Sequence, residues 1–183
     1  MIALNSILIL LTAFIAVFLQ CSTNLTQRIF GTQFDLLPPL MVYAGLTGGP
    51  WTVAALALCG GLWFDSLSAN TPGLTVLSLL LVGQLITLRR ELILRQQSYA
   101  QIALGLAAGA AVPLLSLLLL WSAGKSPVVG WGTVWQILVL TAVSGVATPV
   151  LFKLFGFLIH NFGYRDPASP GFRPDREIRR GRI

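Results

Sequence analysis

One feature restricts the fold of this chain more than any other: apolar runs of helix length follow one another, separated by short polar breaks. A hydrocarbon core about 30 Å thick is crossed by roughly 20 helical residues, because each residue adds about 1.5 Å. Hydrophobic residues make up 55% of the 183 residues and charged residues only 10%, which does not describe a soluble domain. The sequence therefore predicts an all-α polytopic membrane protein.

The runs predict six transmembrane helices in one domain, residues 1–162. Their approximate ranges are 3–20, 36–46, 51–67, 72–88, 100–121 and 133–157. The second run is short for a full span and begins with two prolines, which suit a first helical turn. Thr71 and Pro72 predict an N-cap and the first position of the fourth helix. The polar residues 21–35 are expected to lie along the membrane surface.

The basic residues predict the orientation of these helices. Most Lys and Arg residues fall between 89 and 95 or between 165 and 182, and cytoplasmic loops are enriched in both types. An even number of spans places both clusters and both termini in the cytoplasm. Topology therefore accounts for the net charge of +6 better than nucleic-acid binding does. Residues 163–183 are predicted to be a disordered cytoplasmic tail.

Asp65 is the only acidic residue inside a predicted span. A charged group at the centre of a membrane helix costs at least about 2.5–3.5 kcal/mol, so such a group usually has a partner or lies near an interface. Gly61 precedes it by one turn and permits close helix contact, while the loop after it supplies hydroxyl, amide and backbone donors. Two interpretations stay open: a structural latch between the third and fourth helices, or a docking point for a partner or substrate.

The sequence offers little for catalysis. Paired acids, a nucleophile beside a base, and a metal cluster are the usual requirements, and the predicted spans hold none of them. We therefore expect no catalytic residue, no metal site, no cofactor and no enzymatic activity.

Small residues and prolines predict how the later helices pack. Gly105 and Gly109 form a small-xxx-small face in the fifth helix, and Pro149 is expected to bend the sixth. The candidate structural or partner-binding residues are Gly61, Asp65, Ser68, Asn70, Gly73, Gly105, Gly109 and Pro149.

The run from Gly61 to Gly73 resembles the signature of the MreD family of rod shape-determining membrane proteins. Members show a Gly, an Asp four residues later and a Gly eight residues beyond that, as Gly61, Asp65 and Gly73 do here. The resemblance covers most of the chain up to about residue 157 and includes Pro39, Tyr43, Pro50 and Pro149. The chain departs from the family at Ala69, where Gly is frequent, and in its longer basic tail.

This resemblance implies a noncatalytic scaffold in the bacterial inner membrane, within the complex that elongates the cell wall and maintains cell shape. The implied partner is MreC, with the MreB filament, RodA and the penicillin-binding transpeptidase of peptidoglycan synthesis nearby. It also implies a fold like that of the S components of energy-coupling transporters.

The S components supply the alternative function, capture of a vitamin or metabolite in a pocket beneath the outer loops. Such a pocket needs several converging polar groups. The sequence offers Trp63, Asp65, Asn70 and Gln84 for this purpose, but their positions along the chain do not show that they converge.

Overall fold

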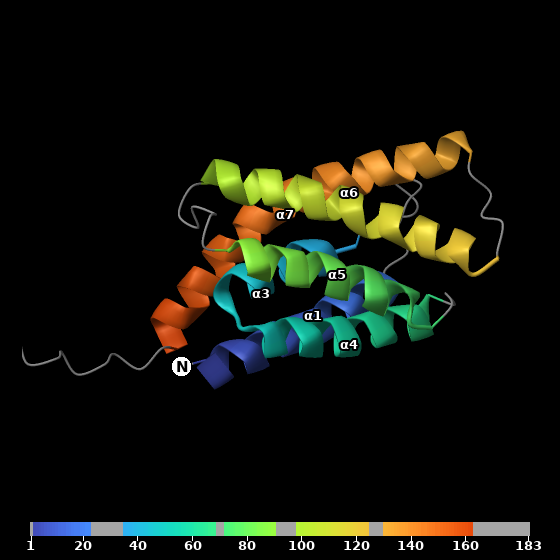
Figure 1. The fold of residues 1–183 in the computed structure, drawn as a ribbon. Helices are drawn as coiled ribbons and strands as arrows, with labels where there is room; N and C mark the ends of the chain where they lie inside the picture. The colour runs from blue at the N-terminus through green and yellow to red at the C-terminus, as the bar shows by residue number, and fades with distance from the viewer. Residues whose placement is uncertain (1, 23–34, 69–71, 91–97, 125–129, 163–183) are drawn as a thin grey trace, which may run out of the picture.

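The computed structural model describes residues 2–22, 35–68, 72–90, 98–124 and 130–162, and within these ranges the chain is helical without strands (Figure 1). The predicted all-α class is confirmed. The predicted tail, residues 163–183, lies outside the described residues. The helices are α1 (Ile2–Ser22), α3 (Leu37–Thr47), α4 (Pro50–Leu67), α5 (Leu74–Arg89), α6 (Ser98–Ser122) and α7 (Trp131–Phe162).

The short helix α3 is the centre of the bundle. It contacts each of the other described helices, and all its residues from Leu37 to Leu46 are buried. Pro38 lies in its first turn, as the sequence predicts. A helix that is apolar on every side is a buried helix, and α3 fits this rule because its neighbours enclose it.

Aromatic contacts fix α3 against α7. Tyr43 stacks on Phe155 with ring centroids 4.3 Å apart, and it meets Phe152 edge-on at 4.9 Å. Stacked and edge-on ring pairs add stability beyond their buried area. Pro149 lies inside α7, one to two turns before these phenylalanines, and Figure 1 shows that α7 changes direction along its course.

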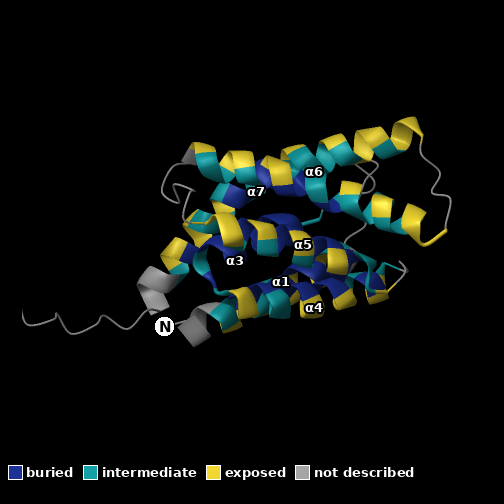
Figure 2. Cartoon of the chain, viewed as in Figure 1, coloured by how far each residue is buried: buried dark blue, intermediate teal, exposed yellow. Residues whose placement is uncertain are grey.

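The outer surface of the bundle is apolar, and Figure 2 shows exposed residues along the outward faces of the helices. One row of exposed leucines follows α5: Leu77, Leu81, Leu85 and Leu88. Exposed aromatic residues lie at both ends of the bundle. Trp51 and Tyr99 lie where α4 and α6 begin, while Trp121 and Trp131 lie at the opposite end, where α6 ends and α7 begins. In membrane proteins, tryptophan and tyrosine are enriched at the two membrane–water interfaces.

Two of the described helices are long and apolar enough to cross a membrane: the parts of α6 and α7 at Tyr99–Ser122 and Trp131–Leu158. The apolar helices at Ser6–Gln20, Leu37–Thr47 and Leu74–Arg89 are shorter. The 11 residues of α3 cover about 16 Å at 1.5 Å per residue, about half of a hydrocarbon core. The six spans predicted from the sequence are therefore not supported by the helix lengths.

Candidate functional site

The signature residues of the sequence meet in one joint between α4 and α5. Asp65 is 1% exposed, and its Oδ2 accepts hydrogen bonds from the backbone N–H groups of Gly73 at 2.8 Å and Thr75 at 3.3 Å. These N–H groups belong to the first turn of α5, where no carbonyl of the same helix can accept them. A carboxylate near a helix N-terminus is also favoured by the helix dipole. Asp65 therefore caps α5 from a neighbouring helix.

This cap corrects the predicted start of the fourth helix. The first helical residue is Leu74, Gly73 is the N-cap, and Pro72 lies in the turn before it. The prediction that Pro72 takes the first helical position is wrong. Gly73 has a φ of +92°, a conformation that favours glycine, and it presents its N–H to Asp65.

Gly61 completes the joint one turn earlier in α4. A Cβ atom on Gly61 would lie 2.9 Å from the backbone N and Cα of Val76. Because the obstacle is backbone of α5, a rotamer change cannot relieve the contact. The absence of a side chain at residue 61 thus permits the approach of α4 and α5 that brings Asp65 to the first turn of α5.

In the part of the chain that the structure describes, two buried polar atoms beside the joint have no hydrogen-bond partner, Asp65 Oδ1 and Ser68 Oγ. The sequence suggests that the turn after Asp65 supplies its donors, whereas the observed donors are Gly73 and Thr75. Asn70, also a candidate residue, lies outside the described residues.

The remaining candidate residues lie where α6 packs on α7. A Cβ on Gly105 would meet the backbone O of Ser144 at 2.7 Å, and one on Gly109 would meet the Ser144 Cβ at 2.6 Å. The two glycines therefore form the face of α6 against which α7 lies. Pro149 follows Ser144 on the same helix and stands apart from the joint at Asp65.

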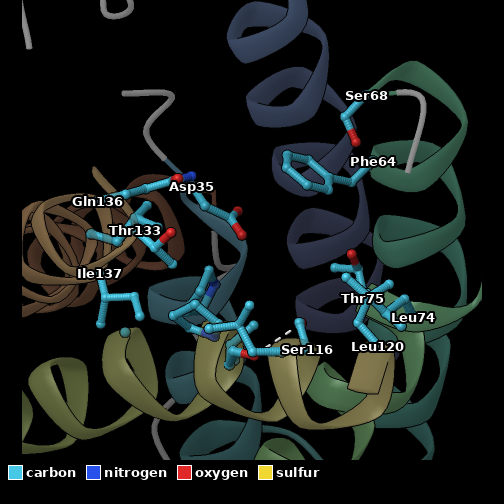
Figure 3. Close-up of a pocket in the computed structure, with 16 residues that line it drawn as sticks. Asp35, Phe64, Ser68, Leu74, Thr75, Ser116, Leu120, Thr133, Gln136 and Ile137 are labelled. Carbon is cyan, nitrogen blue, oxygen red and sulfur yellow. Dashed lines mark hydrogen bonds between the residues drawn. The ribbon is translucent and has the colours of Figure 1, made fainter. Parts of the chain in front are cut away.

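A cavity of about 340 Å³ connects these two regions (Figure 3). Phe64 and Ser68 of α4 line it together with Gly109 of α6 and residues from α5 and α7. Its polar lining residues are Asp35, Ser68, Thr75, Ser116, Thr133 and Gln136. Figure 3 shows Asp35 between Thr133 and Gln136 on one side and Phe64 and Ser68 on the other. The cavity is thus mostly apolar with a few polar groups, as ligand sites commonly are.

Asp35 is the charged group of this cavity. It precedes α3, and its Oδ1 accepts a hydrogen bond from the Leu37 N–H at 2.9 Å. Burial raises the pKa of Asp35 to about 6, while the Leu37 hydrogen bond acts in the opposite direction. No Lys, Arg or His is among the described residues that line the cavity. Asp35 itself is partly buried, and residues 23–34 of the segment that we expect along the membrane surface lie outside the described residues.

Ser116, which lines the cavity, forms a hydroxyl pair with Ser78. The Oγ atoms of Ser78 on α5 and Ser116 on α6 lie 2.9 Å apart, and each also lies within hydrogen-bond distance of a carbonyl of its own helix, Leu74 O and Val112 O. Each hydroxyl has one proton to donate, so two of these three hydrogen bonds form at any moment.

Sequence reasoning missed most of the cavity. Asp35, Ser116, Thr133 and Gln136 are far apart in the chain and share no motif. The one available signal was the acidic residue just before the two prolines that open α3. Among the described residues, no group of three His, Cys, Asp or Glu side chains is placed to hold a metal ion.

Comparison of the chain with protein-family models, with curated proteins and with solved structures found no match.

Proposed function

We propose that this chain is a noncatalytic scaffold of the MreD type in the bacterial inner membrane, where it binds MreC and helps to couple cell-wall synthases to MreB filaments. The observation that carries the proposal is the joint between α4 and α5. The three residues of the MreD-like signature, Gly61, Asp65 and Gly73, all serve that joint. They fix the relative position of two helices, which is the property that a scaffold requires.

The hydrogen bonds and burial of Asp65 support a structural role for this residue. One of its oxygens accepts two backbone hydrogen bonds, and the side chain is almost completely buried. A carboxylate with these hydrogen bonds holds the start of α5 against α4. Its contribution to a partner interface is then indirect: the joint orders the exposed faces of α4 and α5, and preorganisation lowers the entropy cost of binding.

The exposed apolar faces support a location within lipid and contact with partner helices. Leu58, Leu62 and Trp63 are exposed on α4, beside the joint, and the leucine row is exposed on α5. Without a hydrophobic driving force between helices in lipid, such faces associate by close packing. In the proposed arrangement MreC contacts this α4–α5 face, and RodA and the penicillin-binding transpeptidase join through MreC.

The proposed orientation places both termini in the cytoplasm. Arg89 and Arg90 lie at the end of α5, and the Arg90 Nη1 donates to the carbonyl of Gly48 at 3.3 Å. This end of the bundle therefore carries positive charge, which favours the cytoplasmic side. The opposite end, with the Asp65 joint and the cavity, then faces the periplasm.

The scaffold function is tested by co-purification of MreC with tagged variants of this chain from native membranes. Gly61→Leu is expected to reduce MreC recovery, because the leucine would collide with the Val76 backbone and displace α5. Gly156→Leu is the matched control, since a Cβ at Gly156 meets nothing within 4 Å. Complementation of rod shape in depleted cells provides the second readout. Normal MreC recovery and normal rods with Gly61→Leu would overturn the proposal.

The alternative, a substrate-capturing S component of an energy-coupling transporter, is favoured by one observation, the cavity near the joint. Its 340 Å³ lies at the small end of the range for ligand pockets, about 300–1,000 Å³. A small molecule bound after purification, or uptake that requires an energy-coupling module, would favour transport. Rounded cells on depletion, with recovery of MreC, would favour the scaffold.

A further inference from the structure

We propose that the cavity bounded by α4, α5, α6 and α7 binds a small amphipathic molecule that carries a protonated amine, with the ammonium group at Asp35. The inference goes beyond the scaffold function and does not depend on it. It also supplies the ligand chemistry that the transport alternative leaves open.

The position of the charge is the first argument. Among the described residues that line the cavity, Asp35 is the only ionisable one, so none of them supplies a cation to an ionised Asp35. Its Oδ1 is engaged by the Leu37 N–H, and its Oδ2 accepts no hydrogen bond from the described residues. Unpaired charge in a poorly solvated site is costly, and an ammonium group on the ligand would offset that cost. The raised pKa of Asp35 reflects the same unfavourable burial.

The second argument is an unused polar atom on the opposite wall. Ser68 Oγ is buried and has no hydrogen-bond partner among the described residues, although Ser68 lines the cavity. Buried polar groups are nearly always paired, so an unpaired one in a ligand-sized space indicates a missing partner. Figure 3 shows Ser68 and Asp35 on different sides of the same space. A ligand that spans the cavity can therefore meet both residues.

The third argument is the apolar wall. The cavity is also lined by Leu117 and Leu120 of α6 and by Ile137 and Leu140 of α7. Wherever they lie around the cavity, these apolar side chains favour a ring or short hydrocarbon body over a compact hydrophilic amine. The ligand is thus expected to combine one cationic end with one apolar end.

Three indole compounds test the chemistry because they differ mainly in the terminal group. Tryptamine carries the ammonium, tryptophol a neutral hydroxyl, and indole-3-propionate a carboxylate. The full chain is purified and placed in phosphatidylcholine nanodiscs at pH 7.5, and binding is measured by calorimetry and by the shift of the thermal unfolding midpoint. Tryptamine is expected to bind at least about tenfold more tightly than tryptophol, the effect of one charge-assisted hydrogen bond. Indole-3-propionate is expected not to bind.

Two variants locate the site. Asp35→Asn keeps the shape of the side chain and removes its charge, so tryptamine affinity is expected to fall to that of tryptophol. Leu140→Phe fills the cavity and is expected to abolish binding of both compounds. Leu154→Phe makes the same change on an exposed part of α7 away from the cavity and is expected to bind tryptamine like the parent chain.

The amine can come from a free metabolite or from a lipid headgroup, and a further arm separates these sources. Nanodiscs that contain phosphatidylethanolamine are compared with nanodiscs of phosphatidylcholine alone. Competition with tryptamine by phosphatidylethanolamine assigns the site to a lipid amine, and unchanged affinity assigns it to a soluble amine.

Equal affinity for tryptamine and tryptophol, or full tryptamine binding by Asp35→Asn, would overturn the proposal. Because binding is measured on the purified chain without MreC, either result leaves the co-purification test of the scaffold function unaffected.

Discussion

Two aspartates lie near the same end of this bundle, and their surroundings differ. Asp65 is held at the α4–α5 joint, where one oxygen accepts hydrogen bonds from Gly73 and Thr75. Asp35 faces a cavity with a single hydrogen bond from the adjacent Leu37. The first carboxylate stabilises the contact between two helices. The second accepts one hydrogen bond from the described residues and lines the cavity. The residue type alone does not assign the role, whereas the donors around each carboxylate do.

The largest expected effect is on the joint itself. Gly61→Leu is expected to lower the free energy of unfolding by about 3 kcal/mol, because the new side chain must displace the α5 backbone at Val76. Chemical unfolding in mixed detergent micelles measures the change, with Gly156→Leu as the exposed control. Equal stability of the two variants would show that α5 can move away from α4 at little cost.

Removal of the cap is expected to have the next largest effect. Asp65→Ala leaves the N–H groups of Gly73 and Thr75 without their acceptor in a buried site, which costs about 2 kcal/mol. Asp65→Asn keeps an acceptor oxygen and is expected to lose about half as much. The same unfolding assay compares the two. A larger loss for Asn than for Ala would contradict the capping role.

Replacement of Asp35 is expected to raise the free energy of unfolding, whereas replacement of Asp65 is expected to lower it. Because its pKa is raised to about 6 from an ordinary value of 3.8, folding favours its protonated form. This penalty is absent below about pH 4, grows as pH rises towards 6, and is complete above about pH 7. Asp35→Asn is therefore expected to raise stability by about 2 kcal/mol at pH 8 and to change little at pH 4.

A comparison of pH 4 and pH 8 separates this effect from others because the nearby lining residues of α4, α5, α6 and α7 do not titrate. Asp65 lies near the cavity and is present in both the parent chain and Asp35→Asn, so it does not contribute to the difference between them. A stability gain that is the same at both pH values would argue against a buried carboxylate at residue 35.

Ser68→Ala is expected to have the smallest effect on stability. The Ser68 Oγ is buried and unpaired, so its removal is expected to change the free energy of unfolding by less than about 1 kcal/mol, with a small gain favoured. The same substitution is expected to weaken tryptamine binding if the ligand supplies the missing partner. A clear loss of stability would mean that Ser68 contributes to the α4–α5 joint.

Local patterns predicted most of the helices, because each apolar run is bounded by polar residues, glycine or proline. They failed at the start of α5, where the cap is Asp65, a side chain from the preceding helix. A local rule considers only the residues next to the helix, so it assigned the cap to Thr71. The short length of α3 was visible in the sequence, but its central position depends on contacts with all its neighbours.

The candidate site also has one part that the sequence predicted and one part that it did not. Gly61, Asp65 and Gly73 were candidates because they lie close together in the chain and form one motif. The cavity was not foreseen, since Asp35 and Gln136 are brought near each other by the packing of α7 and α6 against α3 and α5. The polarity of the segment around Asp35 gave no sign of the cavity, whose other walls come from helices much later in the sequence.

The central position of α3 also bears on how such a bundle is assembled. Helices that insert into a membrane one by one must each be long enough to cross it, and the 11 residues of α3 are not. In a membrane, α3 must therefore enter together with neighbours that cover its ends and sides. Its stacking of Tyr43 on Phe155 requires α7, the last described helix of the chain. The core of the bundle is thus complete only when synthesis has passed residue 155.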